Sequence, residues 1–131
     1  MRYLFDTNAW LRWFHQPEEL NALTRRIINA ESVIALSPMS IIEIAQKVHK
    51  RKLSFSIAVE QWVRDSTPVD RIELLPITIE IALRSYEWPD DFQGDPADRI
   101  IAATAAVHGL ILVTSDEKLL GRTDMQTLST R

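Results

Sequence analysis

Acidic residues are the side chains of this sequence with the clearest chemical potential. Four carboxylates brought together would repel one another and raise their pKa values unless a cation lay between them. Mg²⁺ and Mn²⁺ prefer such oxygen ligands. One or two of these ions can activate water and stabilise the charge that develops on a phosphate. The four candidates for such a site are Asp6, Glu43, Asp98 and Asp116.

Helix capping is the alternative explanation for each acid taken singly. Asp6 and Asp116 precede segments that could form short helices, and Ser40 and Glu43 have the spacing of a capping box. In the stretch GDPADRIIAATA, Asp95 can cap a helix whose first turn contains Asp98. Capping and metal binding can coexist, because a capping carboxylate keeps a free oxygen.

The elements that must position these acids alternate between strands and helices. Apolar runs predict strands at 3–5, 32–36, 72–77, 110–113 and 125–128. Helical spacing and cap residues predict helices at 9–14, from Pro17 onward, 38–50, 56–65, 79–86, 96–108 and just after 116. The strands lack polar alternation, which favours a parallel sheet covered on both faces. We therefore predict one α/β domain over residues 1–131, with a central parallel sheet of about four to five strands flanked by helices on both faces.

The carboxyl edge of such a sheet would gather the four acids. Ligands of open α/β sheets bind beyond the carboxyl ends of the strands. Asp6 lies at the end of the first strand, Asp116 lies just past the strand LILV, and Glu43 lies one to two turns into the helix after a strand. Asp98 begins a helix that runs back toward the next strand, so it starts at the same edge.

Composition limits the alternatives. The chain has 131 residues, 46% of them hydrophobic, and a net charge of −3, which argues against a general polyanion binder. It has no cysteine and three scattered histidines, so zinc is the poorer candidate. The first residues do not read as a signal peptide and no apolar run could span a membrane, so we expect a cytoplasmic protein without membrane contact.

Four motifs in order resemble the PIN-domain family. They are LFDTNAWLRWF, the segment Ser40–Ala45, GDPADRIIAATA and LVTSD, and the likeness runs from Tyr3 to Leu120. It is closest to the VapC-type ribonuclease toxins of prokaryotic toxin–antitoxin pairs. The resemblance implies a sheet with the first strand central and acids that bind Mg²⁺ or Mn²⁺. It also implies hydrolysis of RNA phosphodiester bonds by in-line attack of an activated water.

The resemblance also assigns roles to individual residues. Asp6 would be a direct metal ligand and Glu43 the acid carried by a helix, and Asp98 and Asp116 would complete the catalytic and metal-binding set. In this reading Asp95 caps its helix while Asp98 faces the metal. Candidate supporting residues are Asn8, Asp95, Thr114 and Ser115.

Basic residues suggest where RNA could bind. A tract at the end of the Glu43 helix either contacts RNA phosphates or forms a solvated helix end favoured by the helix dipole. Arg99 could bind phosphate or pair with a neighbouring acid, and the pair is the favoured reading. The candidate RNA-binding residues are Lys47, Lys50, Arg51, Lys52 and Arg99.

Partners follow from aromatic residues and from the resemblance. Trp10, Trp13 and Phe14 crowd one short segment, where they fit a core or, if exposed, a groove for a partner helix. We expect Trp62 and Trp88 to pack. The family resemblance implies a cognate small antitoxin of VapB type and a homodimer.

Two other classes of function compete with a nuclease. A receiver-like or haloacid-type phosphate-handling domain fits poorly, since position 8 is Asn and no suitable late Lys stands out. A catalytically silent PIN-like module that only binds nucleic acid or protein would usually lack one or more of the acids, and all four are present here.

Overall fold

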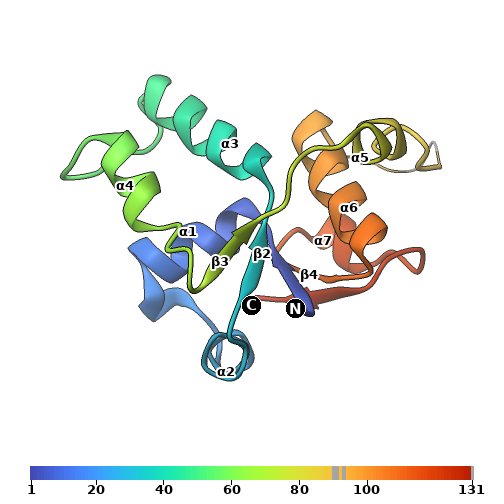
Figure 1. The fold of residues 1–131 in the computed structure, drawn as a ribbon, viewed down its shortest axis with the longest axis horizontal. Helices are drawn as coiled ribbons and strands as arrows, with labels where there is room; N and C mark the ends of the chain where they lie inside the picture. The colour runs from blue at the N-terminus through green and yellow to red at the C-terminus, as the bar shows by residue number, and fades with distance from the viewer. Residues whose placement is uncertain (90–91, 93, 131) are drawn as a thin grey trace.

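The sheet has five parallel strands with the first strand at its centre (Figure 1). The computed structural model describes the whole chain except residues 90, 91, 93 and 131. The strand order is β3-β2-β1-β4-β5, which confirms the predicted parallel α/β fold. The strands are β1 (Tyr3–Phe5), β2 (Ile34–Leu36), β3 (Ile72–Leu74), β4 (Ile111–Thr114) and β5 (Thr127–Ser129).

Helices cover both faces of the sheet, each over its own apolar core. Along β1, Phe5 packs with α1 to α4 on one face, whereas Leu4 packs with α6 and α7 on the other. Side chains of a strand alternate between faces, so even three-residue strands supply both cores. The helices are α1 (Thr7–His15), the 3-10 helix η1 (Pro17–Glu19), α2 (Ala22–Ala30), α3 (Pro38–His49), α4 (Val59–Asp65), α5 (Ile79–Arg84), α6 (Pro96–His108) and α7 (Glu117–Leu120).

Cap residues set most helix ends as the sequence predicts. Ser37 caps α3 by accepting a hydrogen bond from the Met39 amide, and Gly109 ends α6 in the left-handed conformation at φ 65°. The predicted helix start at Pro17 is wrong. Pro17 opens only the short η1, and α2 begins after Asn21, whose side chain accepts from the Thr24 amide at 2.8 Å.

The aromatic segment of α1 belongs to the core. Trp10 is fully buried, its ring lies 5.1 Å from that of Trp62, and its indole N–H donates to the Ser66 carbonyl at 2.7 Å. Trp13 is half-buried and contacts Phe5 edge to face. Burial of Trp10 supports the core interpretation over that of an open partner groove.

The first strand also fixes the edge where the acids lie. The backbone amide of Asp6 donates to the Val113 carbonyl at 3.1 Å, so the residue after β1 stays paired to β4. Among the described residues, no helix is long and apolar enough to cross a membrane.

Candidate active site

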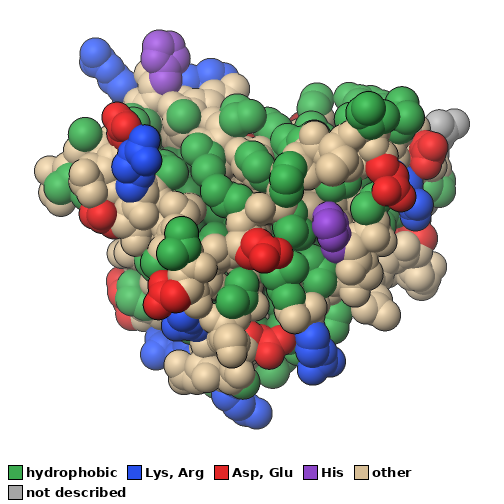
Figure 2. Space-filling model, viewed as in Figure 1, with side chains coloured by type: hydrophobic (Ala, Val, Ile, Leu, Met, Phe, Trp, Pro, Cys, Tyr) green, Lys and Arg blue, Asp and Glu red, His purple; other side chains and the backbone are tan. Residues whose placement is uncertain are grey.

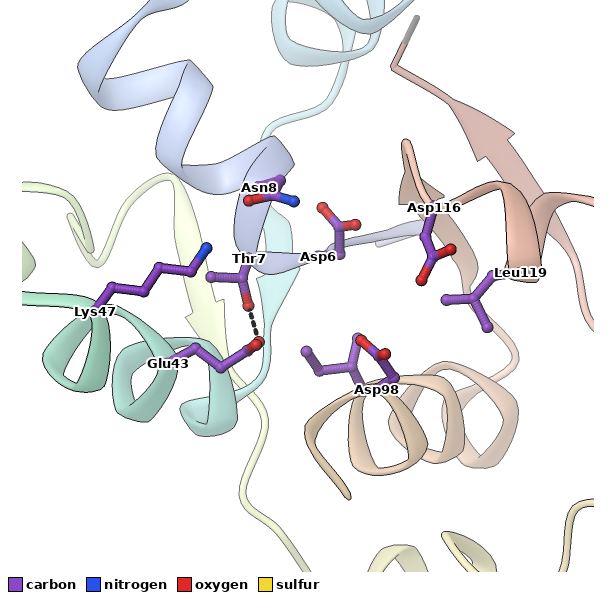
Figure 3. A pocket seen from close by; sticks show the side chains of 9 residues that line it. Asp6, Thr7, Asn8, Glu43, Lys47, Asp98, Asp116 and Leu119 are labelled. Atoms are coloured by element: carbon purple, nitrogen blue, oxygen red, sulfur yellow. Dashed lines mark hydrogen bonds between the residues drawn. The ribbon is translucent and has the colours of Figure 1, made fainter. Parts of the chain in front are cut away.

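One pocket at the carboxyl edge of the sheet collects all four predicted acids (Figure 3). The acids come from four different places. Asp6 follows β1 and Glu43 lies in helix α3, whereas Asp98 lies in the first turn of α6 and Asp116 lies two residues after β4. In Figure 3 the carboxylates of Asp6, Asp98 and Asp116 point toward a common space, and Glu43 approaches it from α3. The pocket is lined by Asp6, Thr7, Asn8, Glu43, Lys47, Asp98, Ile101, Asp116 and Leu119.

Asp6 is held on two sides. Its carboxylate accepts from the Ala9 amide at 2.8 Å and caps α1, and the buried Thr114 hydroxyl also bonds to it. Burial raises the pKa of Asp6 and the nearby Glu43 raises it further, while the Thr114 and Ala9 hydrogen bonds act in the opposite direction. Asp6 therefore has a fixed orientation and a charge that its surroundings disfavour.

Thr114 links two of the acids. Besides bonding to Asp6, its hydroxyl oxygen accepts from the Asp116 amide at 3.0 Å. Asp116 in turn caps α7 by accepting from the Lys118 amide at 2.9 Å. The candidate supporting residue Thr114 thus lies between Asp6 and Asp116, although it is buried behind the pocket wall.

The Glu43 carboxylate is held by the buried Thr7 hydroxyl, which in turn contacts Ser40, and no sequence pattern indicates this arrangement. Thr7 donates to the Glu43 carboxylate, and the Thr7 and Ser40 hydroxyl oxygens lie 2.9 Å apart. A hydroxyl has one proton, so Ser40 donates to Thr7 while Thr7 donates to Glu43. Ser37 caps α3, as the sequence favours, so Ser40 and Glu43 do not form the alternative capping box at this helix start.

Asp95 and Asp98 occupy different places, the first as a helix cap and the second in the lining of the pocket. Asp95 is exposed and its side chain accepts from the Asp98 amide at 2.9 Å, as an N-cap does. Asp98 is half-buried in the pocket. Burial, together with the charges of Asp95, Asp116 and Glu43, raises the pKa of Asp98 to about 6, and the Asp95 amide offsets part of this.

Positive charge in the pocket is scarce. Among the described residues, no Lys or Arg forms an ion pair with any of the four acids. Carboxylates in that condition suit a hard divalent cation. Within the same described part of the chain, however, no three acidic or histidine side chains are placed so that they could hold one ion by themselves.

The remaining sequence candidates divide into residues near the pocket and residues far from it. Asn8 and Lys47 line it, and in Figure 3 the Lys47 amine points toward Thr7 and Asn8. Ser115 is buried beside Asp116 and does not line the pocket. The pocket also includes Ile101 and Leu119, apolar residues that sequence patterns mark only as core.

The other basic candidates lie away from the acids. Lys50, Arg51 and Lys52 are exposed beyond the C-terminal end of α3. The guanidinium of Arg99 donates to the Phe92 carbonyl at 3.1 Å and lies 5.0 Å from the Tyr86 ring centroid. Among the described residues its partners are thus a carbonyl and aromatic rings, including that of Phe92, rather than the expected acid.

Comparison with known proteins gives the family. The PIN domain profile matches residues 3–124. Ribonuclease VapC22 of Mycobacterium tuberculosis is 30% identical over 116 residues, which cover 88% of each chain.

Solved structures show the same fold. VapBC2 from Rickettsia felis, bound to a DNA fragment from its promoter, has a TM-score of 0.74 at 15% identity, with 100% of both chains covered. A toxin–antitoxin complex from Klebsiella pneumoniae has a TM-score of 0.70 at 23% identity, with 98% of both chains covered. This chain therefore belongs to the PIN-domain family and is related to its VapC-type members.

Proposed function

We propose that this protein is a metal-dependent endoribonuclease and the toxin of a VapBC-type toxin–antitoxin pair. The observation that carries the proposal is the convergence of four carboxylates, from four elements, on one pocket without a paired cation. The likeness to a VapC ribonuclease over 88% of the chain supports the choice of RNA as substrate.

The cofactor in this proposal is Mg²⁺ or Mn²⁺, held by Asp6, Asp98, Glu43 and Asp116. The donor set fits, since every acidic group is an oxygen ligand and burial raises the pKa values of Asp6 and Asp98. Among the described residues no three acidic or histidine side chains could hold an ion alone, and Mg²⁺ typically keeps several waters and takes few carboxylates. Such an ion supplies an activated water and neutralises charge on the phosphate.

The chain's own residues prepare the pocket for this chemistry. The Thr114 hydroxyl and the Ala9 amide orient Asp6, and the Thr7 hydroxyl orients Glu43, before any ligand arrives. Lys47 places a positive charge at the rim, where an RNA phosphate would enter. Asp98, with its pKa raised to about 6, is mostly deprotonated at neutral pH and would then be able to hold a cation.

Protein partners are part of the proposal. The solved relatives include toxin–antitoxin complexes, which supports a VapB-type antitoxin as the cognate partner. A homodimer would cover apolar side chains that are exposed in the single chain, namely Ile42 of α3 and Ile79 and Leu83 of α5. We also expect the protein to act in the cytoplasm.

The test is cleavage of a mixed pool of structured RNAs by purified, partner-free protein. Reactions contain Mg²⁺, Mn²⁺ or a chelator, and compare the wild type with Asp6→Asn and Asp98→Asn. Asp65→Asn is the matched control, because Asp65 is an exposed carboxylate that accepts only from Gln61 on its own helix. Calorimetry on each protein measures metal binding independently of cleavage.

We expect metal-dependent cleavage by the wild type and by Asp65→Asn, and none by the other two variants. Equal cleavage by all four proteins would identify a contaminating nuclease. Absence of both cleavage and metal binding in the wild type would instead favour the catalytically silent PIN-like binding module.

A further inference from the structure

The C-terminal end of α3 closes with a backbone motif that normally contains glycine. The Lys52 amide donates to the Lys47 carbonyl at 2.9 Å and the Arg51 amide donates to the Val48 carbonyl at 3.0 Å. This pair of bonds is the Schellman motif, which requires a left-handed residue between helix and loop. Arg51 occupies that position with φ 58°.

Helix α6 ends in the same way with the usual residue. Leu110 donates to Ala105 at 2.8 Å and Gly109 donates to Ala106 at 3.3 Å, with Gly109 at φ 65°. Among the described non-glycine residues, Arg51 alone has a positive φ. A side chain in the left-handed region is destabilising relative to glycine, so folding does not account for arginine at this position.

The helix dipole explains only part of the basic tract. Cations near a helix C-terminus are stabilising, which accounts for Lys47 and Lys50. The dipole also favours a cation near Arg51, but it gives no reason for the left-handed position to carry a side chain in place of glycine. A charged residue retained at a conformational cost indicates a role in binding.

The three residues Lys50, Arg51 and Lys52, here called the α3 tip, form an open basic surface. All three are exposed, and within the described part of the chain none forms an ion pair. Together with Lys47, the tip contains four of the chain's 15 Lys and Arg residues, although the net charge is −3. Figure 2 shows Lys, Arg and His side chains gathered at the upper left of the molecule, where α3 ends in Figure 1.

We propose that the α3 tip binds the RNA backbone at a distance from the phosphate that is cut. Glu43 and Lys47 of the same helix line the pocket, and Arg51 lies eight residues beyond Glu43, or about 12 Å along the helix axis. An RNA strand entering past Lys47 thus meets the tip several nucleotides from the reacting bond. This inference rests on the proposed ribonuclease function for its choice of RNA as ligand.

The test measures RNA binding and stability in the same variants. Fluorescence anisotropy in chelator follows binding of an RNA of about 20 nucleotides across a salt series, so that no cleavage interferes. The proteins are the wild type, Arg51→Gly and the triple variant Lys50→Gln/Arg51→Gly/Lys52→Gln. Arg26→Ala is the control, because Arg26 is exposed on α2, away from α3, and its loss removes the same charge.

Arg51→Gly should raise the melting temperature by a few degrees while weakening RNA binding roughly threefold. The triple variant should weaken binding roughly tenfold or more, and each lost contact should reduce the salt slope by about 0.7. Arg26→Ala should leave binding unchanged. Because the gain in stability and the loss of binding have opposite signs, misfolding cannot imitate the result.

Cleavage then separates this inference from the proposed function. With Mg²⁺ or Mn²⁺, tip variants should lose more cleavage of the RNA of about 20 nucleotides than of an RNA of about three nucleotides, since the short RNA spans little of the distance from the pocket to the tip. If the wild type cuts neither RNA, the proposed nuclease function is refuted. The anisotropy measurement would still decide whether the α3 tip binds RNA. Equal binding of the long RNA by wild type and triple variant overturns the inference, even if the variants bind an acidic antitoxin peptide more weakly.

Discussion

Glu43 and Asp98 approach the same pocket from helices α3 and α6 and are supported in different ways. Glu43 accepts from Thr7, whose hydroxyl is itself bonded to Ser40, so a chain of buried groups from α1 and α3 fixes its carboxylate. Asp98 faces the charges of Asp95, Asp116 and Glu43, and among the described residues the opposing contribution is a hydrogen bond from the backbone amide of Asp95 at its own helix start. Its pKa is raised to about 6.

This difference indicates that the two sides of the pocket respond differently to a ligand. Hydrogen bonds set the Glu43 side in advance. Asp98 instead is destabilised when charged and is relieved by a proton or a cation. The protein thus combines one preorganised carboxylate with one whose state depends on what occupies the pocket.

The largest effect should come from Asp98→Asn. We expect RNA cleavage to fall at least about 100-fold, because one of the proposed metal ligands is lost. The same change should raise the melting temperature of metal-free protein at pH 7.5, since an amide carries no charge beside the other carboxylates. Glu43→Gln should also lose cleavage but gain no stability. Thermal melts in chelator measure the stability of both variants. A lower melting temperature for Asp98→Asn than for the wild type would contradict the difference drawn between Asp98 and Glu43.

Thr7→Val tests the preorganised side. Loss of the hydroxyl should weaken Mn²⁺ binding and cleavage by about 10-fold, within the range seen when outer partners of metal ligands are removed. Thr7→Ser keeps the hydroxyl and should restore both. Titration calorimetry with Mn²⁺ gives the affinity. Equal metal affinity in Thr7→Val and wild type would show that Glu43 needs no fixed orientation.

The stability of the metal-free protein should depend on pH through Asp98. Its pKa rises from 3.8 to about 6 on folding, so between these values the folded state binds more protons than the unfolded state. The contribution of Asp98 to the free energy of unfolding is therefore most favourable at low pH and is lost as pH rises through about 6. Mg²⁺ should raise the melting temperature more at pH 7.5 than at pH 5. A larger metal effect at pH 5 would refute this account of the Asp98 side.

The smallest effect should come from Asp95. Asp95→Asn keeps a capping side chain but removes the charge that helps to raise the pKa of Asp98, so the pH transition in stability should move to lower pH. Asp95→Ala should cost about 1 kcal/mol of stability through loss of the cap. Both variants should still cleave RNA. Loss of cleavage in Asp95→Asn would mean that Asp95 acts in the pocket and not only as a cap.

Sequence patterns predicted the parallel sheet and the four-acid edge because both follow from periodicity and from where strands end. Asp6 directly follows an apolar run and Asp116 lies shortly after another, and Asp95 and Pro96 mark a helix start that the structure reproduces. The contact of Thr7 with Ser40 could not be predicted in this way. This contact depends on how α1 packs against α3. Thr7 and Ser40 are 33 residues apart in the sequence, and no local pattern encodes a contact over that separation.

Other errors have local causes. Pro17 and the acids after it satisfy the rules for a helix start, but Asn21 offers a better cap a few residues later. For Arg99 the sequence favours a neighbouring carboxylate, whereas its partners among the described residues include the aromatic rings of Tyr86 and Phe92. The start of α2 and the partners of Arg99 both depend on which of several neighbouring groups offers the better contact. The preference of a single residue does not decide such a competition.

The central position of β1 has a consequence for how the protein is made. The strand synthesised first is completed on one side by β2 and on the other by β4, which begins only at Ile111. A growing chain therefore carries Asp6 and Glu43 long before Asp98 and Asp116 can join them. Because of this strand order, the pocket can form only after β4 and Asp116 have been synthesised. A ribosome can therefore produce most of this chain before the four acids can act together on RNA.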